Sequence, residues 1–284
     1  MTIGKNIKPL YHYTTLVNAV NILQSKTIWA SDSRYLNDRK ELFSSIELFK
    51  RILDISPSEK ENFSSSFFIH NARRAFCIFS LSESPSILSQ WKSYSDDGHG
   101  ICLGFNTQSL EFQKYKFGHM QLVDCVYINH EEFLESVISE FKSEIDEFRS
   151  MCKMQNIMDF WHELAKNPKP LDIIYAQLLR IKYKHFAEEK ESRLVICDPL
   201  NHAKLRTGKN IIIPYLQIEL ISKEMETDND LKETFWCEIP EIWLGPKSDD
   251  RNINALRVFD QFGWVPKKEY DGRAGIYKFD CGYR

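Results

Sequence analysis

The stretch EEFLESVISEFKSEIDEFRSMC, residues 131–152, decides the fold because its periodicity differs from that of the sequence around it. From Leu134 to Cys152, apolar residues recur every three or four positions with charged residues between them. This spacing is typical of amphipathic helices, and a further helix is expected from Leu171 to about Ala187. A helical block at about 131–187 therefore interrupts a chain whose other apolar runs are short.

Strands are expected on both sides of this helical block, where short apolar and aromatic runs are bounded by turn residues. They are Tyr11–Tyr13, Thr27–Ala30, Phe76–Leu81, Gly100–Phe105, Val123–Ile128, Arg193–Cys197, Ile211–Tyr215, Ile239–Leu244 and Gly275–Asp280. Regular crossover helices do not separate most of these strands, which favours the α+β class over a doubly wound parallel sheet. We expect a single domain over residues 1–284, with the helical block inserted between two halves of one sheet.

Composition excludes several classes of protein. The 37 basic and 40 acidic residues give a net charge of -3, which offers no global attraction to nucleic acid or to an anionic membrane. No apolar run is long enough to span a membrane, and the first residues do not resemble a secretory signal. The seven cysteines are scattered without a CxxC pair, which predicts free thiols in a reducing cytoplasm and no metal site.

The segment LYHYTT, residues 10–15, is the first candidate for a functional site. His12 lies at the end of an expected strand, and Thr14 or Thr15 can cap the helix that follows. Free N–H groups at a helix start suit phosphate or hydroxyl groups, so His12 is well placed to contact a ligand. The alternative is a structural histidine between two core tyrosines.

Aromatic residues after the strand Phe76–Leu81 form the second candidate. Trp91 and Tyr94 make a slot for a planar ring, and Gly98 and Gly100 would let the backbone approach a ligand closely. The alternative is that the two aromatics pack one helix face into the core and that the glycines only form a turn.

Charged residues before the strand Arg193–Cys197 form the third candidate. Glu189, Glu191 and Arg193 share one face if the strand begins near Glu189. The guanidinium would then hold the carboxylates in place, and one carboxylate would stabilise a developing positive charge. The alternative is a solvated run of charges at a helix end.

Together these segments resemble DUF2971, a bacterial domain family of unknown function. The matching residues are Leu10–Thr14, Leu36–Asp38, Glu41, Phe79–Ser82, Trp91, Tyr94, Gly100–Phe105, Lys184, Phe186, Glu189, Glu191, Arg193 and Leu244–Pro246. The resemblance covers most of the chain except the helical block and the extreme C-terminus. The family itself implies no activity.

The order of histidine, aromatic residue and glutamate also looks like the ADP-ribosyltransferase fold. That resemblance implies a mixed, mostly antiparallel split sheet with flanking helices, and NAD as the substrate. His12, beside Thr14, would anchor the adenosine-side ribose of NAD. Tyr13, Trp91 or Tyr94 would wall the nicotinamide ring.

The same resemblance assigns roles to the charged segment. Glu191 would hold the nicotinamide ribose and stabilise the oxocarbenium-like centre. Glu189 would orient the acceptor or a water molecule, and Arg193 would fix Glu191 or bind a phosphate. The function implied is an NAD-dependent ADP-ribosyltransferase or NAD glycohydrolase, in the role of a toxin or phage-defence effector.

Two alternatives stay open, and the sequence does not establish that the protein is an enzyme. One is an enzyme that processes RNA or DNA, which would need Arg73, Arg74, Lys182 and Lys184 to converge on the pocket. The other is a non-catalytic module that binds a nucleotide or a partner. The acceptor, either protein or nucleic acid, and the oligomeric state stay open as well.

Overall fold

The computed structural model describes residues 8–36, 39–57, 59, 62–64, 66, 75–107, 110, 119–198, 202–208, 210–220, 225–226, 232–233, 239, 241–260 and 275–283. The strands are β1 (Leu10–Thr14), β2 (Thr27–Asp32), β3 (Ala75–Ser82), β4 (Ile101–Phe105), β5 (His119–Asp124), β6 (Glu191–Asp198), β7 (Lys204–Thr207), β8 (Ile212–Glu219), β9 (Met225–Glu226), β10 (Lys232–Glu233), β11 (Glu241–Leu244) and β12 (Gly275–Lys278). The α-helices are α1 (Leu16–Ser25), α2 (Arg39–Ile52), α4 (Leu88–Tyr94), α6 (His130–Glu140), α7 (Lys142–Cys152), α8 (Ile157–Lys166), α9 (Lys169–Leu178) and α10 (Arg251–Asp260). Short 3-10 turns are η1 (Ser33–Tyr35), η2 (Asp96–Gly98) and η3 (Lys184–Glu189).

The main sheet is open and largely antiparallel, which agrees with the class expected from the sequence. Its strands follow the order β12-β11-β4-β1-β3-β2-β8-β7, and β6 pairs with β3 and β5. Along one edge of β3, β1 pairs at Ser82 and β2 pairs at Cys77 and Ile78. Between these points β1 and β2 diverge, so the sheet splits beside the middle of β3.

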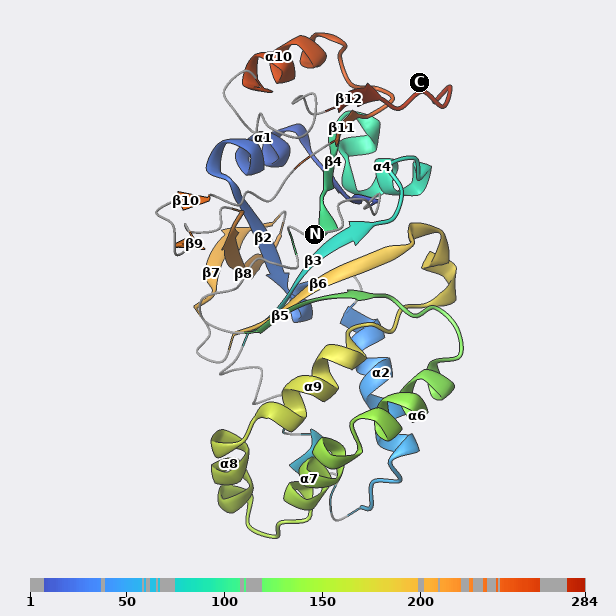
Figure 1. The fold of residues 1–284 in the computed structure, drawn as a ribbon. Helices are drawn as coiled ribbons and strands as arrows, with labels where there is room; N and C mark the ends of the chain where they lie inside the picture. Colours follow the sequence, from blue (N-terminus) through green and yellow to red (C-terminus); the bar gives the residue numbers. More distant parts are fainter. Residues whose placement is uncertain are drawn as a thin grey trace.

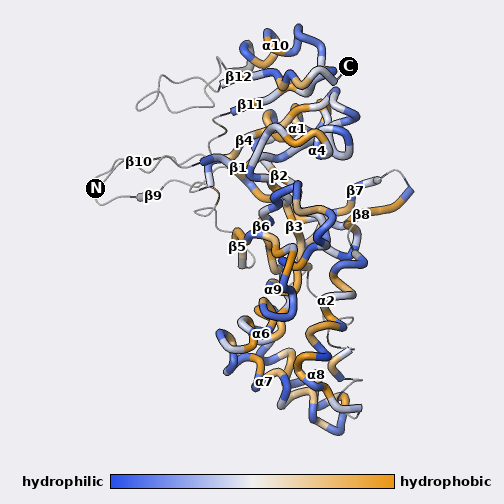
Figure 2. Tube along the Cα trace, turned by 90° about the vertical axis from the view of Figure 1, so that its right-hand side faces the viewer, coloured by the Kyte–Doolittle hydropathy of each residue, from blue (hydrophilic) through white to orange (hydrophobic). Residues whose placement is uncertain are grey.

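The strands β3 and β6 separate two hydrophobic cores, because side chains alternate between the faces of a strand. Phe76, Ile78 and Val195 pack against α2 and α6–α9, which form a helical lobe at one end of the molecule (Figure 1). Phe79 and Leu194 face the other core, which α1, β4, β8 and α10 complete. Figure 2 shows hydrophobic residues along β3 and β6, and alternating with hydrophilic ones along the lobe helices.

The helical lobe differs in two respects from the expected helical block. It includes α2, which packs against α6 and α9, so the block at 131–187 is not the whole lobe. The last helix ends at Leu178 rather than near Ala187. After it, the chain forms a bridge in which Lys182 N donates to Val126 O at 2.9 Å. That bridge also replaces the end of the strand expected over Val123–Ile128.

Helix starts and turns follow local chemistry. Thr15 caps α1 by accepting a hydrogen bond from Asn18 N at 3.3 Å, as expected. The capping box at Asp38 lies outside the described residues. Among the residues that the structure describes, no helix has the length and apolar character needed to cross a membrane.

Gly98 and Gly100 allow close packing around the start of β4. This agrees with the structural explanation of these glycines rather than with close approach to a ligand. A Cβ on Gly100 would lie 2.2 Å from the carbonyl oxygen of Thr14. Gly98 has a φ of +88°, and its Cβ would lie 3.1 Å from Pro246. Neither glycine is among the residues that line the cavity described below.

Replacing Gly100 by alanine should lower the free energy of unfolding by about 1–3 kcal/mol, because β1 or the turn before β4 must move to admit the methyl group. Chemical denaturation measures the change. The control is Ser93→Ala on the exposed side of α4, which should stay within about 0.5 kcal/mol. Equal stability of the two variants would contradict the close approach at Gly100.

Candidate functional site

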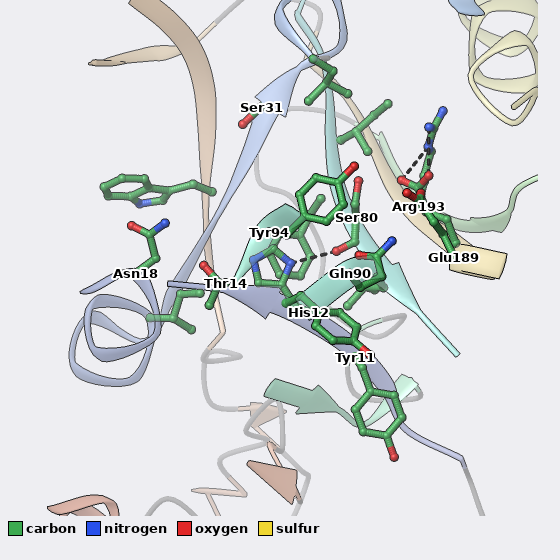
Figure 3. Close-up of a pocket in the computed structure, with 18 of the residues that line it drawn as sticks. Tyr11, His12, Thr14, Asn18, Ser31, Ser80, Gln90, Tyr94, Glu189 and Arg193 are labelled. Carbon is green, nitrogen blue, oxygen red and sulfur yellow. Dashed lines mark hydrogen bonds and ion pairs between the residues drawn. The ribbon is translucent and has the colours of Figure 1, made fainter. Parts of the chain in front are cut away.

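A cavity of about 330 Å³ lies where β1 and β2 diverge from β3. Its walls come from β1, α1, β2, β3, α4, β6, β7 and the segment between α9 and β6, which brings together parts of the chain far apart in sequence (Figure 3). The volume is in the lower part of the range of about 300–1,000 Å³ typical of small-molecule sites. Of the residues predicted to form the site, His12, Tyr13, Thr14, Tyr94, Glu189, Glu191 and Arg193 line this cavity.

The side chain of His12 forms a hydrogen bond with the backbone of β3 at the split in the sheet. Its Nδ1 lies 2.9 Å from the carbonyl oxygen of Ser80 on β3, so Nδ1 carries the proton and donates it. The ring also stacks on Phe79 with 4.2 Å between centroids. Nε2 lies on the side of the ring away from Ser80 (Figure 3) and is left as a hydrogen-bond acceptor for a ligand.

Burial keeps this imidazole neutral. Desolvation lowers the pKa of His12 to about 4, although the hydrogen bond to Ser80 acts in the opposite direction. At neutral pH His12 is therefore an acceptor for a hydroxyl group and does not carry a positive charge.

The neighbours of His12 on β1 are structural supports of the cavity wall. The Tyr13 hydroxyl donates to Ser84 O at 2.7 Å and accepts from Ile87 N at 3.0 Å, so both of its hydrogen-bonding functions have partners within the protein. Thr14 is buried beside the start of α1. These contacts fix the wall against which a ligand would lie.

Four charged side chains form an ionic cluster at one end of the cavity: Lys182, Glu189, Glu191 and Arg193, each nearly inaccessible to solvent. Lys182 Nζ donates to Glu189 and, at 2.6 Å, to Glu191. Arg193 Nε and Nη2 donate to the two oxygens of Glu191 at 3.0 and 3.1 Å. The alternative of a solvated charge run is therefore wrong.

The charges in this cluster hold Glu191 ionised. Burial by itself would raise the pKa of Glu191, but Arg193 and Lys182 outweigh it and lower the pKa to about 2. Burial would likewise lower the pKa of Lys182, and the two carboxylates keep it above its ordinary value. A third carboxylate, Glu41 of α2, lies 4.0 Å from Arg193.

Glu189 reaches the cluster from outside the strand. β6 begins at Glu191, Glu189 ends η3, and Lys190 between them has a φ of 44°. The expectation that Glu189, Glu191 and Arg193 share one strand face is therefore wrong for Glu189. Both carboxylates nevertheless converge, since each pairs with the ammonium group of Lys182.

The aromatic walls are only partly those expected. Tyr94 lines the cavity with 38% of its surface exposed, whereas Trp91 is fully buried and packs between Tyr13 and Phe279. Trp91 is thus a core residue rather than a wall of the cavity. Trp29 on β2 was missed. Its sequence surroundings, an apolar run from Thr27 to Ala30, gave no signal that this side chain faces a cavity.

Two of the four cations needed for the nucleic-acid alternative lie in the part of the chain that the structure describes, and neither is a free cation facing the cavity. Lys182 is paired with carboxylates, Lys184 is exposed in η3, and Arg73 and Arg74 lie outside the described residues. In the part of the chain that the structure describes, no cluster of three or more histidine, cysteine or acidic side chains is arranged to hold a metal ion.

Heteronuclear NMR of the imidazole nitrogens should show His12 with its proton on Nδ1 and a pKa near 4. The unfolded chain binds that proton near pH 6.5, so the unfolded state holds more protons between these values and the free energy of unfolding falls as pH drops through this window. His12→Gln identifies the resonances by their disappearance. An Nε2–H tautomer would contradict the assignment.

Replacing Lys182 by methionine should destabilise the fold by about 3–5 kcal/mol, because two buried carboxylates lose their shared cation. Denaturant unfolding measures the loss. The matched control is Lys184→Met, two residues further on and exposed, for which about 0.5 kcal/mol or less is expected. Similar losses in the two variants would mean that the cluster contributes little.

Residues 90–194 match the model of DUF2971, described as a protein of unknown function, which confirms the resemblance over this part of the chain. The matched segment runs from α4 to β6 and contains Tyr94 and the ionic cluster, but not β1. No curated protein and no solved structure matches the chain. The likeness to the ADP-ribosyltransferase fold therefore stays a prediction.

Proposed function

We propose that the cavity binds NAD and that the protein cleaves the bond between nicotinamide and ribose, as an ADP-ribosyltransferase or an NAD glycohydrolase. The observation that carries the proposal is that His12 and Glu191, which are far apart in sequence, line one cavity at the split of the sheet. An imidazole acceptor and an ionised carboxylate are the groups that this chemistry requires.

The reaction needs negative charge beside the ribose. When the C–N bond breaks, its electron pair leaves with nicotinamide, and ribose C1′ becomes positively charged. Glu191 would stabilise that charge as a carboxylate rather than by proton transfer, since its low pKa keeps it ionised. With Glu41 the cluster holds three carboxylates against two cations, which favours a cationic centre.

The remaining roles follow from position. Nε2 of His12 accepts a hydrogen bond from a ribose hydroxyl, and Tyr94 packs against the nicotinamide ring. Glu189 orients the nucleophile. In hydrolysis the nucleophile is water, whose oxygen forms the new bond to C1′ while one of its protons passes to solvent. In ADP-ribosyl transfer an acceptor group takes the place of water.

A second candidate is a non-catalytic nucleotide-binding module. It is favoured by one specific observation, namely that both oxygens of Glu191 already accept hydrogen bonds from Lys182 and Arg193. Such a carboxylate is firmly positioned but is less available to contact a sugar. A role as a toxin or phage-defence effector would follow from NAD consumption and stays a prediction.

Glu191→Gln should lower the rate of nicotinamide release from NAD by about 100- to 1,000-fold, because the charge that stabilises the ribose cation is lost. Chromatography of the reaction mixture measures nicotinamide. The control is Glu188→Gln, an exposed carboxylate three residues earlier, which should leave the rate unchanged. Circular dichroism and thermal melting establish that both variants are folded.

Because Glu191→Gln leaves two cations partly unbalanced, His12→Gln provides a second test that does not touch the ionic cluster. It should raise the KM for NAD more than it lowers kcat, since His12 contacts the ribose before and during the reaction. Absence of nicotinamide release from the wild-type protein, with NAD binding retained, would favour the non-catalytic module.

A further inference from the structure

The end of the cavity away from the ionic cluster is lined by a different set of polar and aromatic side chains. One face of the strands β2 and β8 packs into the second core through residues such as Ile28 and Leu216. The pairing register places Trp29, Ser31 and Tyr215 on the opposite face. Figure 3 shows Ser31 and Asn18 across the cavity from Glu189 and Arg193. This face therefore forms a second wall that none of the roles above uses.

Arg206 supplies a positive charge to this wall. Its Nη2 donates to Ser31 Oγ at 2.9 Å, and the side chain lines the cavity. Among the residues that the structure describes, no carboxylate pairs with Arg206, whereas Arg193 at the other end is paired with Glu191. Burial also lowers the pKa of Arg206, so its guanidinium is partly desolvated and gains from an anionic partner.

Trp29 supplies a flat apolar surface beside this cation. The indole ring lies against Tyr215 with 4.6 Å between the ring centroids. Tyr215 is buried and holds the indole in place, while 40% of the surface of Trp29 is exposed. An exposed aromatic face supported from one side is suited to stack on a planar base.

We infer that Arg206 and Trp29 form a subsite for the phosphate-bearing, adenosine half of a nucleotide ligand. Arg206 binds the phosphate oxygens through its planar guanidinium, and Trp29 packs against the base. This inference rests on the proposed function and specifies how the ligand is oriented in the cavity. The anionic half of the ligand lies at Arg206, and the nicotinamide ribose lies at Glu191.

Titration calorimetry with two probes tests the subsite. ADP-ribose carries phosphates, and adenosine carries none. Arg206→Gln should weaken the binding of ADP-ribose by about 10- to 100-fold and leave that of adenosine unchanged, since only ADP-ribose loses a charge-assisted hydrogen bond. Trp29→Leu should weaken both probes by about 5- to 100-fold.

The matched control is Lys204→Gln, which removes a positive charge two residues earlier on the same strand. Lys204 is exposed and its Nζ donates to Gln217, outside the cavity. It should leave the binding of both probes unchanged. An equal loss for Lys204→Gln and Arg206→Gln, or an equal effect of Arg206→Gln on the two probes, would overturn the inference.

The outcomes separate this inference from the proposed function. If NAD is cleaved but the Arg206 variant has an unchanged KM and the wild-type protein does not bind ADP-ribose, the subsite is wrong and the reaction stands. If ADP-ribose binds through Arg206 while NAD is not cleaved, the subsite stands and the proposed reaction fails.

Discussion

The buried contact of Glu191 with Lys182 and Arg193 is the interaction on which the rest of the site depends. Removing three charged groups from water costs several kcal/mol for each, and only close mutual pairing offsets that cost. The pairing fixes the first residues of β6 against the segment that follows α9. Arg193 also donates to Leu179 O at 2.6 Å, so the helical lobe and the cavity wall share one set of hydrogen bonds. The lobe cannot shift without disturbing the carboxylate.

The split in the sheet explains why a cavity exists at this place. Where β1 leaves β3, the backbone acceptor of Ser80 loses its strand partner and needs another hydrogen-bond donor. The imidazole of His12 provides the missing donor. The same side chain thus completes the hydrogen bonding of the sheet and presents an acceptor to the cavity. Structural and functional explanations of this histidine are compatible, and a single substitution removes both contributions.

The sequence predicted those parts of the molecule whose signal is local. β1 with its Thr15-capped helix, and the apolar strand β3, follow from patterns within a few residues. The convergence of His12, Tyr94 and Glu191 was inferred from a family resemblance, because no local pattern brings them together.

What could not be predicted depends on contacts between distant segments. The early end of α9 results from a bridge to Val126, more than fifty residues earlier in the chain. Trp91 and Trp29 are both aromatic residues in short elements, and only tertiary packing decides which is buried. Lys182 was considered only as part of a basic patch for nucleic acid, and Arg206 was not singled out, since a cation is expected at the surface until its neighbours in space are known.

The neutral state of His12 has a consequence for how the protein responds to its surroundings. An imidazole that gains a proton only near pH 4 remains the same hydrogen-bond acceptor at neutral and mildly acidic pH. Mild acidification, a common means of switching histidine-containing proteins, would therefore leave this acceptor unchanged in the folded protein and act through His12 only by lowering the free energy of unfolding.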